Sequence, residues 1–86
     1  MNNNLSLYNI FLAVAEAGST LGAAKTLFIS QPAVSKAISK LEASLEVSLF
    51  VRSKKGVRLT DDGLILYDRI KNAFEYIDEG ESVIRE

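Results

Sequence analysis

The sequence predicts a mainly α-helical fold with a small β-hairpin: a winged helix-turn-helix followed by a long dimerisation helix. Three observations support this prediction. Two short helical segments meet at a tight turn that ends in Ser30-Gln31-Pro32, two β-type runs flank a glycine turn, and residues 60–86 keep a helical period to the end. The length of 86 residues suits one small domain.

The composition excludes several classes of site. About half of the residues are apolar, so a core can form without disulfides or a metal. The chain has no cysteine and no histidine, which argues against thiolate zinc sites and against a hydrolase. We therefore expect no metal, no cofactor and no enzymatic activity. The apolar run at residues 10–15 is shorter than the about 20 residues that a membrane span needs, and we expect a cytoplasmic protein without a membrane partner.

The first two helices have clear local signals. Apolar residues recur on one helical face from about residue 5 or 6 to Ala17, and Gly18 follows as a stop. The polar lead Met1–Asn4 has nothing to pack against. The second helix is predicted to span Thr20–Leu27, with Ser19 as its N-cap.

The third helix is predicted from Ser30 to Leu45, with Ser30 as its N-cap. Pro32 has no backbone N–H, so the Ser30 hydroxyl should accept a hydrogen bond from the N–H of Ala33. One apolar stripe should face the core, and it consists of Val34, Ile38, Leu41 and Leu45. The opposite side carries Pro32, Lys36, Ser39 and Ala43, flanked by Ser35 and Lys40.

The second half of the chain predicts a wing and a long helix. Residues 49–52 and 57–59 read as two strands, and Gly56 ends the turn at the position that needs a left-handed backbone. Thr60 should cap the final helix, with Asp61 and Asp62 at its positive end. A heptad-like seam on this helix predicts a dimer interface formed by Tyr67, Ile70, Phe74, Ile77 and Ile84.

The charge of the chain is unevenly distributed. The net charge is −1, yet residues 30–58 hold six basic and two acidic residues, whereas residues 59–86 hold eight acidic and three basic ones. A basic block around a compact, hydrogen-bonding helix start predicts binding to duplex DNA. The expected major-groove residues are Gln31, Pro32, Ser35, Lys36 and Ser39, and the expected phosphate and wing contacts are Ser19, Thr20, Lys40, Arg52, Lys54 and Lys55.

Several residues have a second interpretation. The residues at the start of the third helix also fit an ordinary helix start without a DNA contact. The Lys54-Lys55 pair also fits a solvated turn. Arg52 and Arg58 could pair with acids of the last helix, and Lys36 could contact a base or a phosphate. The alternative function is a winged-helix module for protein–protein interaction through the long helix, although such a module has no need of a basic block.

The motifs together resemble the DNA-binding domain of LysR-type transcriptional regulators. They comprise Ala23-Ala24 through Leu27, the run from Ser30 to Ile38, Leu41-Glu42, the run from Leu49 to Arg52, and the run from Val57 to Thr60. The resemblance implies a bacterial regulator with a DNA-binding domain over residues 1–59 and a linker helix over residues 60–86. It also implies binding to double-stranded DNA that carries an interrupted palindrome. The resemblance further implies a homodimer through the linker helix and a tetramer in the full-length protein. A small-molecule effector would be bound by a C-terminal domain absent from this chain.

The chain departs from the family pattern at four positions. Lys36 stands where arginine is common and offers a point charge in place of a planar fork. Ser39 replaces a frequent basic residue, and Asp62 replaces a frequent alanine. Glu46 stands where the family often has glycine, which disfavours a left-handed cap at the end of the third helix.

Overall fold

A computed structural model describes residues 5–86 of the chain, so the polar lead Met1–Asn4 lies outside the described residues. The described residues form α1 (Leu5–Ala17), α2 (Thr20–Leu27), α3 (Gln31–Leu45), β1 (Phe50–Ser53), β2 (Gly56–Leu59) and α4 (Asp61–Arg85). The two strands pair as an antiparallel hairpin, which we call the wing. The predicted fold class is confirmed, with every predicted helix present.

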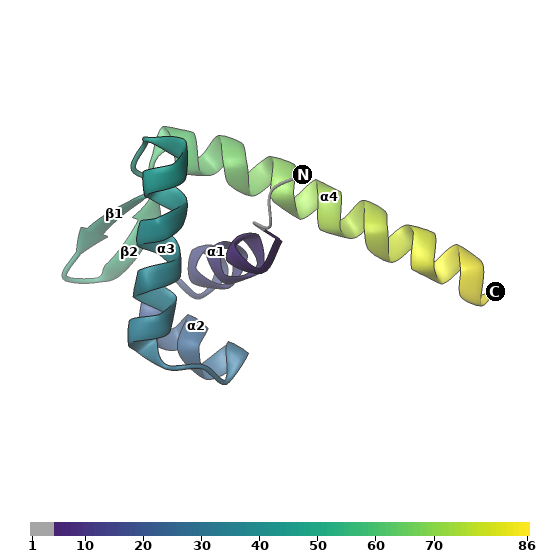
Figure 1. The fold of residues 1–86 in the computed structure, drawn as a ribbon, viewed down its shortest axis with the longest axis horizontal. Coiled ribbons are helices and arrows are strands. Elements are labelled where there is room, and N and C mark those ends of the chain that lie inside the picture. Colours follow the sequence, from purple (N-terminus) through teal and green to yellow (C-terminus); the bar gives the residue numbers. More distant parts are fainter. Residues whose placement is uncertain (1–4) are drawn as a thin grey trace.

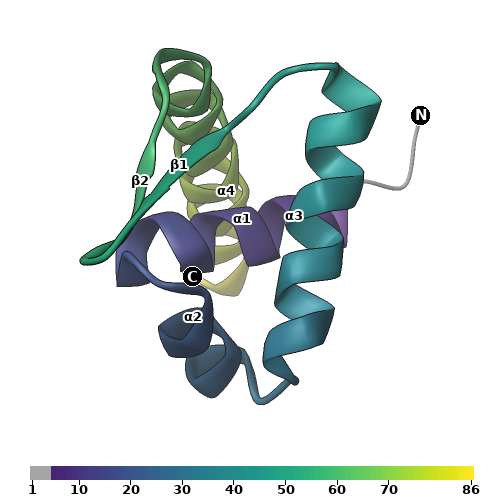
Figure 2. The ribbon, with the colours of Figure 1, turned by 90° about the vertical axis from the view of Figure 1, so that its left-hand side faces the viewer.

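The core forms where α1, α2 and α3 meet. Helix α1 lies at the centre and contacts α2, α3, α4 and β2 (Figure 2). Ala23 and Ala24 of α2 are buried, and their small side chains let this short helix approach its neighbours closely. The largest fully buried side chains are Phe11, Leu41, Leu49, Val14 and Val34.

The predicted N-caps are confirmed. The Ser19 hydroxyl accepts a hydrogen bond from the Gly22 N–H at 2.8 Å, and Thr60 accepts one from Gly63 at 3.0 Å. The Ser30 hydroxyl accepts from Ala33 at 3.2 Å, as the missing N–H of proline requires. Each cap satisfies a donor that the first turn of a helix leaves unpaired.

The C-terminal end of α3 differs from the prediction in two respects. Glu46 adopts the left-handed conformation with φ 59° and ψ 35°, so the expectation drawn from its missing glycine is wrong. Its N–H and that of Val47 both bond to the Glu42 carbonyl oxygen, and these bonds offset a backbone strain of about 1–3 kcal/mol. Leu45 is 41% exposed and not buried with the apolar stripe, because it lies on the last turn, beyond the buried cluster.

The wing packs on the turn between α1 and α2. The N–H of Val57 donates to the Gly18 carbonyl oxygen at 3.0 Å. Gly56 has φ 121°, as predicted for a left-handed position, and a Cβ on it would overlap the Gly18 carbonyl oxygen. The backbone of the wing thus touches the helix-turn-helix directly, and only glycine fits at this contact.

Helix α4 begins against the wing and then leaves the body of the molecule (Figure 1). The Thr60 N–H donates to the Leu49 carbonyl oxygen at 3.0 Å. The Thr60 hydroxyl donates to the backbone carbonyl oxygen of Ser48 at 2.7 Å. Ile70 is buried at 6% exposure, but every residue from 75 to 86 is exposed. The described chain therefore has a long axis of 46 Å, with α3 and the wing at one end and the end of α4 at the other.

Gly63 and Gly80 provide a test of this packing. Gly63→Ala should lower Tm because its Cβ would overlap the Leu49 carbonyl oxygen. Gly80→Ala should leave Tm unchanged or raise it, because its Cβ meets nothing within 4 Å and alanine favours a helix interior by about 1 kcal/mol. Thermal denaturation followed by circular dichroism checks both variants. Equal Tm values for the two would contradict the close contact at Gly63.

Candidate nucleic-acid interface

Helix α3 and the wing lie on the same side of the molecule. Figure 2 views this side, with α3 and the wing in front of α1 and the far end of α4 behind. The acidic residues of α4 extend away from this side, because the helix runs toward the opposite end of the long axis. The structure thus separates the basic block of the sequence from most of its acidic block.

The outer side of α3 is polar, and we call it the recognition face. Ser35 is half-buried, and the other members are exposed; together they are Gln31, Pro32, Ser35, Lys36, Ser39 and Lys40. Val34 and Ile38, on the inner side, are buried at 0% and 4% exposure. The division of α3 into an apolar inner side and a polar outer side matches the predicted one. Compact side chains along the first turn leave this end of the helix free to enter a groove.

Gln31 is held by a residue of α2. Its Nε2 atom donates a hydrogen bond to the Thr20 hydroxyl at 3.0 Å. Thr20 is 8% exposed, so its side chain belongs to the interior. This burial argues against the predicted contact between Thr20 and a phosphate group. Ser19 is half-buried and serves as the cap of α2.

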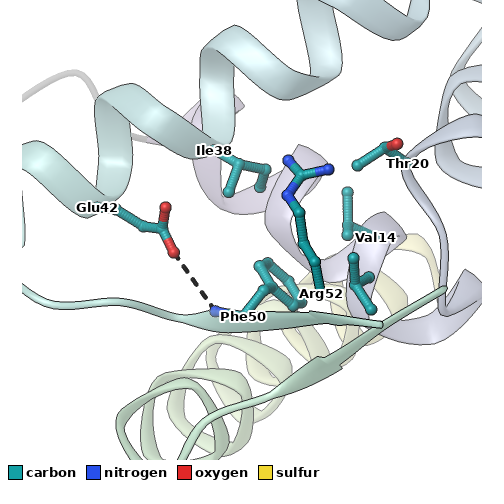
Figure 3. Close-up of a pocket in the computed structure, with 7 residues that line it drawn as sticks. Val14, Thr20, Ile38, Glu42, Phe50 and Arg52 are labelled. Atoms are coloured by element: carbon teal, nitrogen blue, oxygen red, sulfur yellow. Dashed lines mark hydrogen bonds between the residues drawn. The ribbon is translucent and has the colours of Figure 1, made fainter. Parts of the chain in front are cut away.

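The basic residues of the wing fall into two groups. Lys54 and Lys55 occupy the exposed two-residue turn, whose Lys55 N–H donates to the Ser53 hydroxyl at 3.3 Å. Arg52 instead turns back toward α2 and α3, and Figure 3 shows its guanidinium group between Ile38 and Thr20. The Arg52 side chain therefore lies against the start of α2 and the inner side of α3, and it points away from α4. The strand register puts Arg58 on the opposite face of the wing from Arg52.

Glu42 connects α3 to the wing. Its Oε2 atom accepts a hydrogen bond from the backbone N–H of Leu49 at 2.7 Å. It also accepts one from the backbone N–H of Phe50 at 3.4 Å, which Figure 3 shows. Sequence reasoning missed this role, although Glu42 belongs to the Leu41-Glu42 motif and is a half-buried acid in a basic segment. A carboxylate that accepts two backbone N–H groups fixes the start of β1 relative to α3.

The predicted seam of α4 is divided between two environments. Tyr67, Ile70 and Phe74 pack against the core of the same chain, and the Tyr67 hydroxyl donates to the Glu16 carboxylate at 3.3 Å. Ile77 and Ile84 are 51% and 86% exposed. The sequence predicts one continuous interface, but Ile70 contributes to the core of its own chain and offers little surface to a partner. Tyr76 and Val83, which the seam did not include, are also largely exposed.

Residues 5–86 contain neither a metal-binding cluster nor a membrane span. Within this range, no group of three or more His, Cys, Asp or Glu side chains is arranged to hold a metal ion. None of the helices in the same range is long and apolar enough to cross a membrane.

Comparisons with known proteins agree on one family. A family model described as bacterial regulatory helix-turn-helix protein, lysR family, matches residues 5–64. The uncharacterized HTH-type transcriptional regulator Mb2303c of Mycobacterium bovis is 40% identical over 75 residues, which are 87% of this chain and 24% of that protein. The chain thus spans about a quarter of the length of this curated relative.

Two solved structures match almost end to end. The CbnR DBD in its DNA complex has a TM-score of 0.82 and 35% identity, with 93% of this chain and 92% of that chain covered. The BenM DBD in its complex with benA site 1 DNA has a TM-score of 0.87 and 30% identity, with coverages of 99% and 96%. Both the fold and the family are therefore shared with domains solved on DNA.

Glu42 can be tested by substitution. Glu42→Ala should destabilise the protein by about 1.5–3 kcal/mol, because two backbone donors lose a charged acceptor. Glu42→Gln keeps an acceptor oxygen, so its free energy of unfolding should fall by less than that of Glu42→Ala. Chemical denaturation gives the free energy of unfolding, and amide exchange at Leu49 and Phe50 reports the local loss.

The control for this test is Glu79→Ala, which removes an exposed carboxylate from α4. It should leave both measurements close to those of the unaltered protein. Unchanged protection of Leu49 and Phe50 in Glu42→Ala would contradict the connecting role of Glu42.

Proposed function

The chain belongs to the lysR family of bacterial regulatory helix-turn-helix proteins, and we propose that it binds duplex DNA sequence-specifically as the DNA-binding part of a transcriptional regulator. The observation that carries this proposal is the exposed polar recognition face of α3 beside a basic wing. Its fold matches two domains that were solved in complex with DNA, over more than nine-tenths of each chain. The protein acts by binding, without a cofactor and without catalysis.

In the proposed complex, the first turns of α3 enter the major groove. Gln31 can pair with an adenine edge, and the ring of Pro32 can lie against a thymine methyl group. Ser35 and Ser39 are short enough to approach bases or phosphates, and Lys36 brings a point charge to either. These side chains share the recognition face, which supports their assignment to one groove.

The wing supplies contacts that do not depend on base sequence. Lys54 and Lys55 are exposed on its turn and reach phosphates or the minor groove. In the same proposal Arg52, which lies between the wing and α3, neutralises a phosphate, and its exposed position supports this. Lys40, farther along α3, adds a further phosphate contact.

The proposed assembly is a homodimer through α4. Ile77 and Ile84 are exposed and lie one heptad apart on α4, which supports a contact with a second copy, since a contiguous apolar stripe on a protruding helix marks an interaction site. Two copies of α3 would then meet successive half-sites of an interrupted palindrome about 34 Å apart or a multiple of it. A tetramer, an effector-binding domain and a cytoplasmic location complete the proposal for the longer protein.

The dependence of DNA binding on salt tests the main proposal. The logarithm of the association constant should fall linearly with the logarithm of salt concentration, by about 0.9 for each phosphate contact. Lys54→Ala should weaken binding to all duplexes alike and reduce this slope by about 0.9. Lys71→Ala, the same change on α4, is the control and should leave the slope unchanged.

Fluorescence anisotropy with duplexes selected from a random pool provides the measurement. A salt-independent affinity, or a failure to retain any duplex from the pool, would overturn the proposed function. In that case the exposed part of α4 would favour the alternative of a protein–protein interaction module.

The dimer has a separate test. Ile77→Lys combined with Ile84→Lys should convert the dimer to a monomer, because two charges would enter an apolar contact. These positions make a cleaner test than Phe74, which also packs on its own core. Asn72→Lys combined with Ser82→Lys adds the same charge on other sides of α4 and should preserve the dimer. Sedimentation equilibrium distinguishes the outcomes, and an unaltered protein that stays monomeric at high micromolar concentration refutes the interface.

A further inference from the structure

We propose that Thr20 is a positioning residue that holds the Gln31 amide for base recognition and so sets the base preference at one position of the DNA site. The inference rests on the proposed function and deepens it. Its starting point is the 3.0 Å hydrogen bond from Gln31 Nε2 to the Thr20 hydroxyl, which joins the first turns of α2 and α3.

The environment of Thr20 makes this bond persistent. Thr20 is the buried polar residue of the described core, and only 8% of it is exposed. Its neighbours around a small cavity include the apolar side chains of Val14 and Ile38 and the guanidinium group of Arg52 (Figure 3). Within residues 5–86, no buried side-chain nitrogen or oxygen lacks a hydrogen-bond partner. If Gln31 moved away, the Thr20 hydroxyl, which is only 8% exposed, would lose the hydrogen bond that it accepts, which is unfavourable.

The bond leaves the recognition atoms of Gln31 free. An amide group has two N–H donors and one carbonyl acceptor, and Thr20 uses one donor. Gln31 itself is exposed, and in the described part of the chain its Oε1 atom accepts no intramolecular hydrogen bond. One N–H of an amide lies beside its Oε1, and with Thr20 bound to the other N–H this pair matches an adenine edge, which has an N7 acceptor and an N6 donor. The anchored amide is therefore equipped for an adenine edge.

Anchoring also lowers the cost of recognition. A free glutamine side chain samples many rotamers, and fixing it on DNA costs conformational entropy. The bond to Thr20 restricts the side chain before DNA arrives. Removal of the hydroxyl should therefore reduce discrimination at the base pair that Gln31 reads and leave the phosphate contacts of the wing unchanged.

The test uses three substitutions on α2. Thr20→Val removes the hydroxyl and keeps the shape, Thr20→Ser keeps the hydroxyl, and Thr26→Val makes the same change at an exposed position of α2. Duplexes are first selected from a random pool with the unaltered protein. Each position of the selected sequence is then changed to the other three base pairs, and the affinities are measured for every variant.

We expect Thr20→Val to lose about fivefold to tenfold discrimination at one base pair. The dependence of its DNA affinity on salt concentration and its affinity for random duplexes should stay unchanged. Gln31→Ala should affect the same base pair, and Thr20→Val should add nothing further in the Gln31→Ala background. Thr20→Ser and Thr26→Val should behave like the unaltered protein. Full discrimination in Thr20→Val, or an equal loss at every position, overturns the inference.

Two features keep the test decisive. If the unaltered protein selects no sequence, the proposed function fails; if it selects one that Thr20→Val reads equally well, only the role of Thr20 fails. Gln31 is the sole glutamine of the chain, so its side-chain amide gives an unambiguous NMR signal in the unaltered protein. In the unaltered protein this amide group should be nearly as rigid as the backbone, with an order parameter of about 0.85. A value below about 0.6 contradicts a persistent hydrogen bond between Gln31 and Thr20. This measurement decides the question even if Thr20→Val does not fold.

Discussion

The placement of the wing relative to α3 is the constraint on which the proposed DNA interface depends. Two elements contact one duplex together at a lower cost in conformational entropy when their relative position is fixed before binding. Glu42 fixes it from α3, by accepting the N–H groups of Leu49 and Phe50. Gly18 fixes it from the turn between α1 and α2, by accepting the N–H of Val57. The wing is thus held at both strands, and the strained backbone of Glu46 is part of the turn that makes this possible.

The distribution of charge follows from the same arrangement. A net charge of −1 would not favour a polyanion, but the structure puts most of the acidic block on a helix that leads away from α3 and the wing. Because interactions between exposed charges are screened beyond about 10 Å at ordinary salt, the distant acids oppose binding only weakly. The domain can therefore present a basic surface to DNA and still carry a nearly neutral total charge.

The sequence predicted the features that depend on neighbouring residues. The caps at Ser19, Ser30 and Thr60 involve residues three positions apart, so the local pattern was sufficient. It did not predict the Thr20–Gln31 bond or the contact of Glu42 with β1, because these join residues 7 to 11 positions apart across a turn. The left-handed Glu46 was also missed, since residue preference alone ignores the bonds that hold the turn.

The division of the α4 seam has a consequence for the proposed dimer. One continuous helix carries Ile70, which is locked into the core, and Ile77 and Ile84, which are free. Thr60 bonds the start of this helix to the residues that precede the wing. Because a helix is stiff over such a length, a partner packed on the free part would fix the direction of α3 as well as its distance from the second copy. The spacing of the half-sites would then be set by the helix geometry, and the identity of the bases by Gln31 and its neighbours on α3.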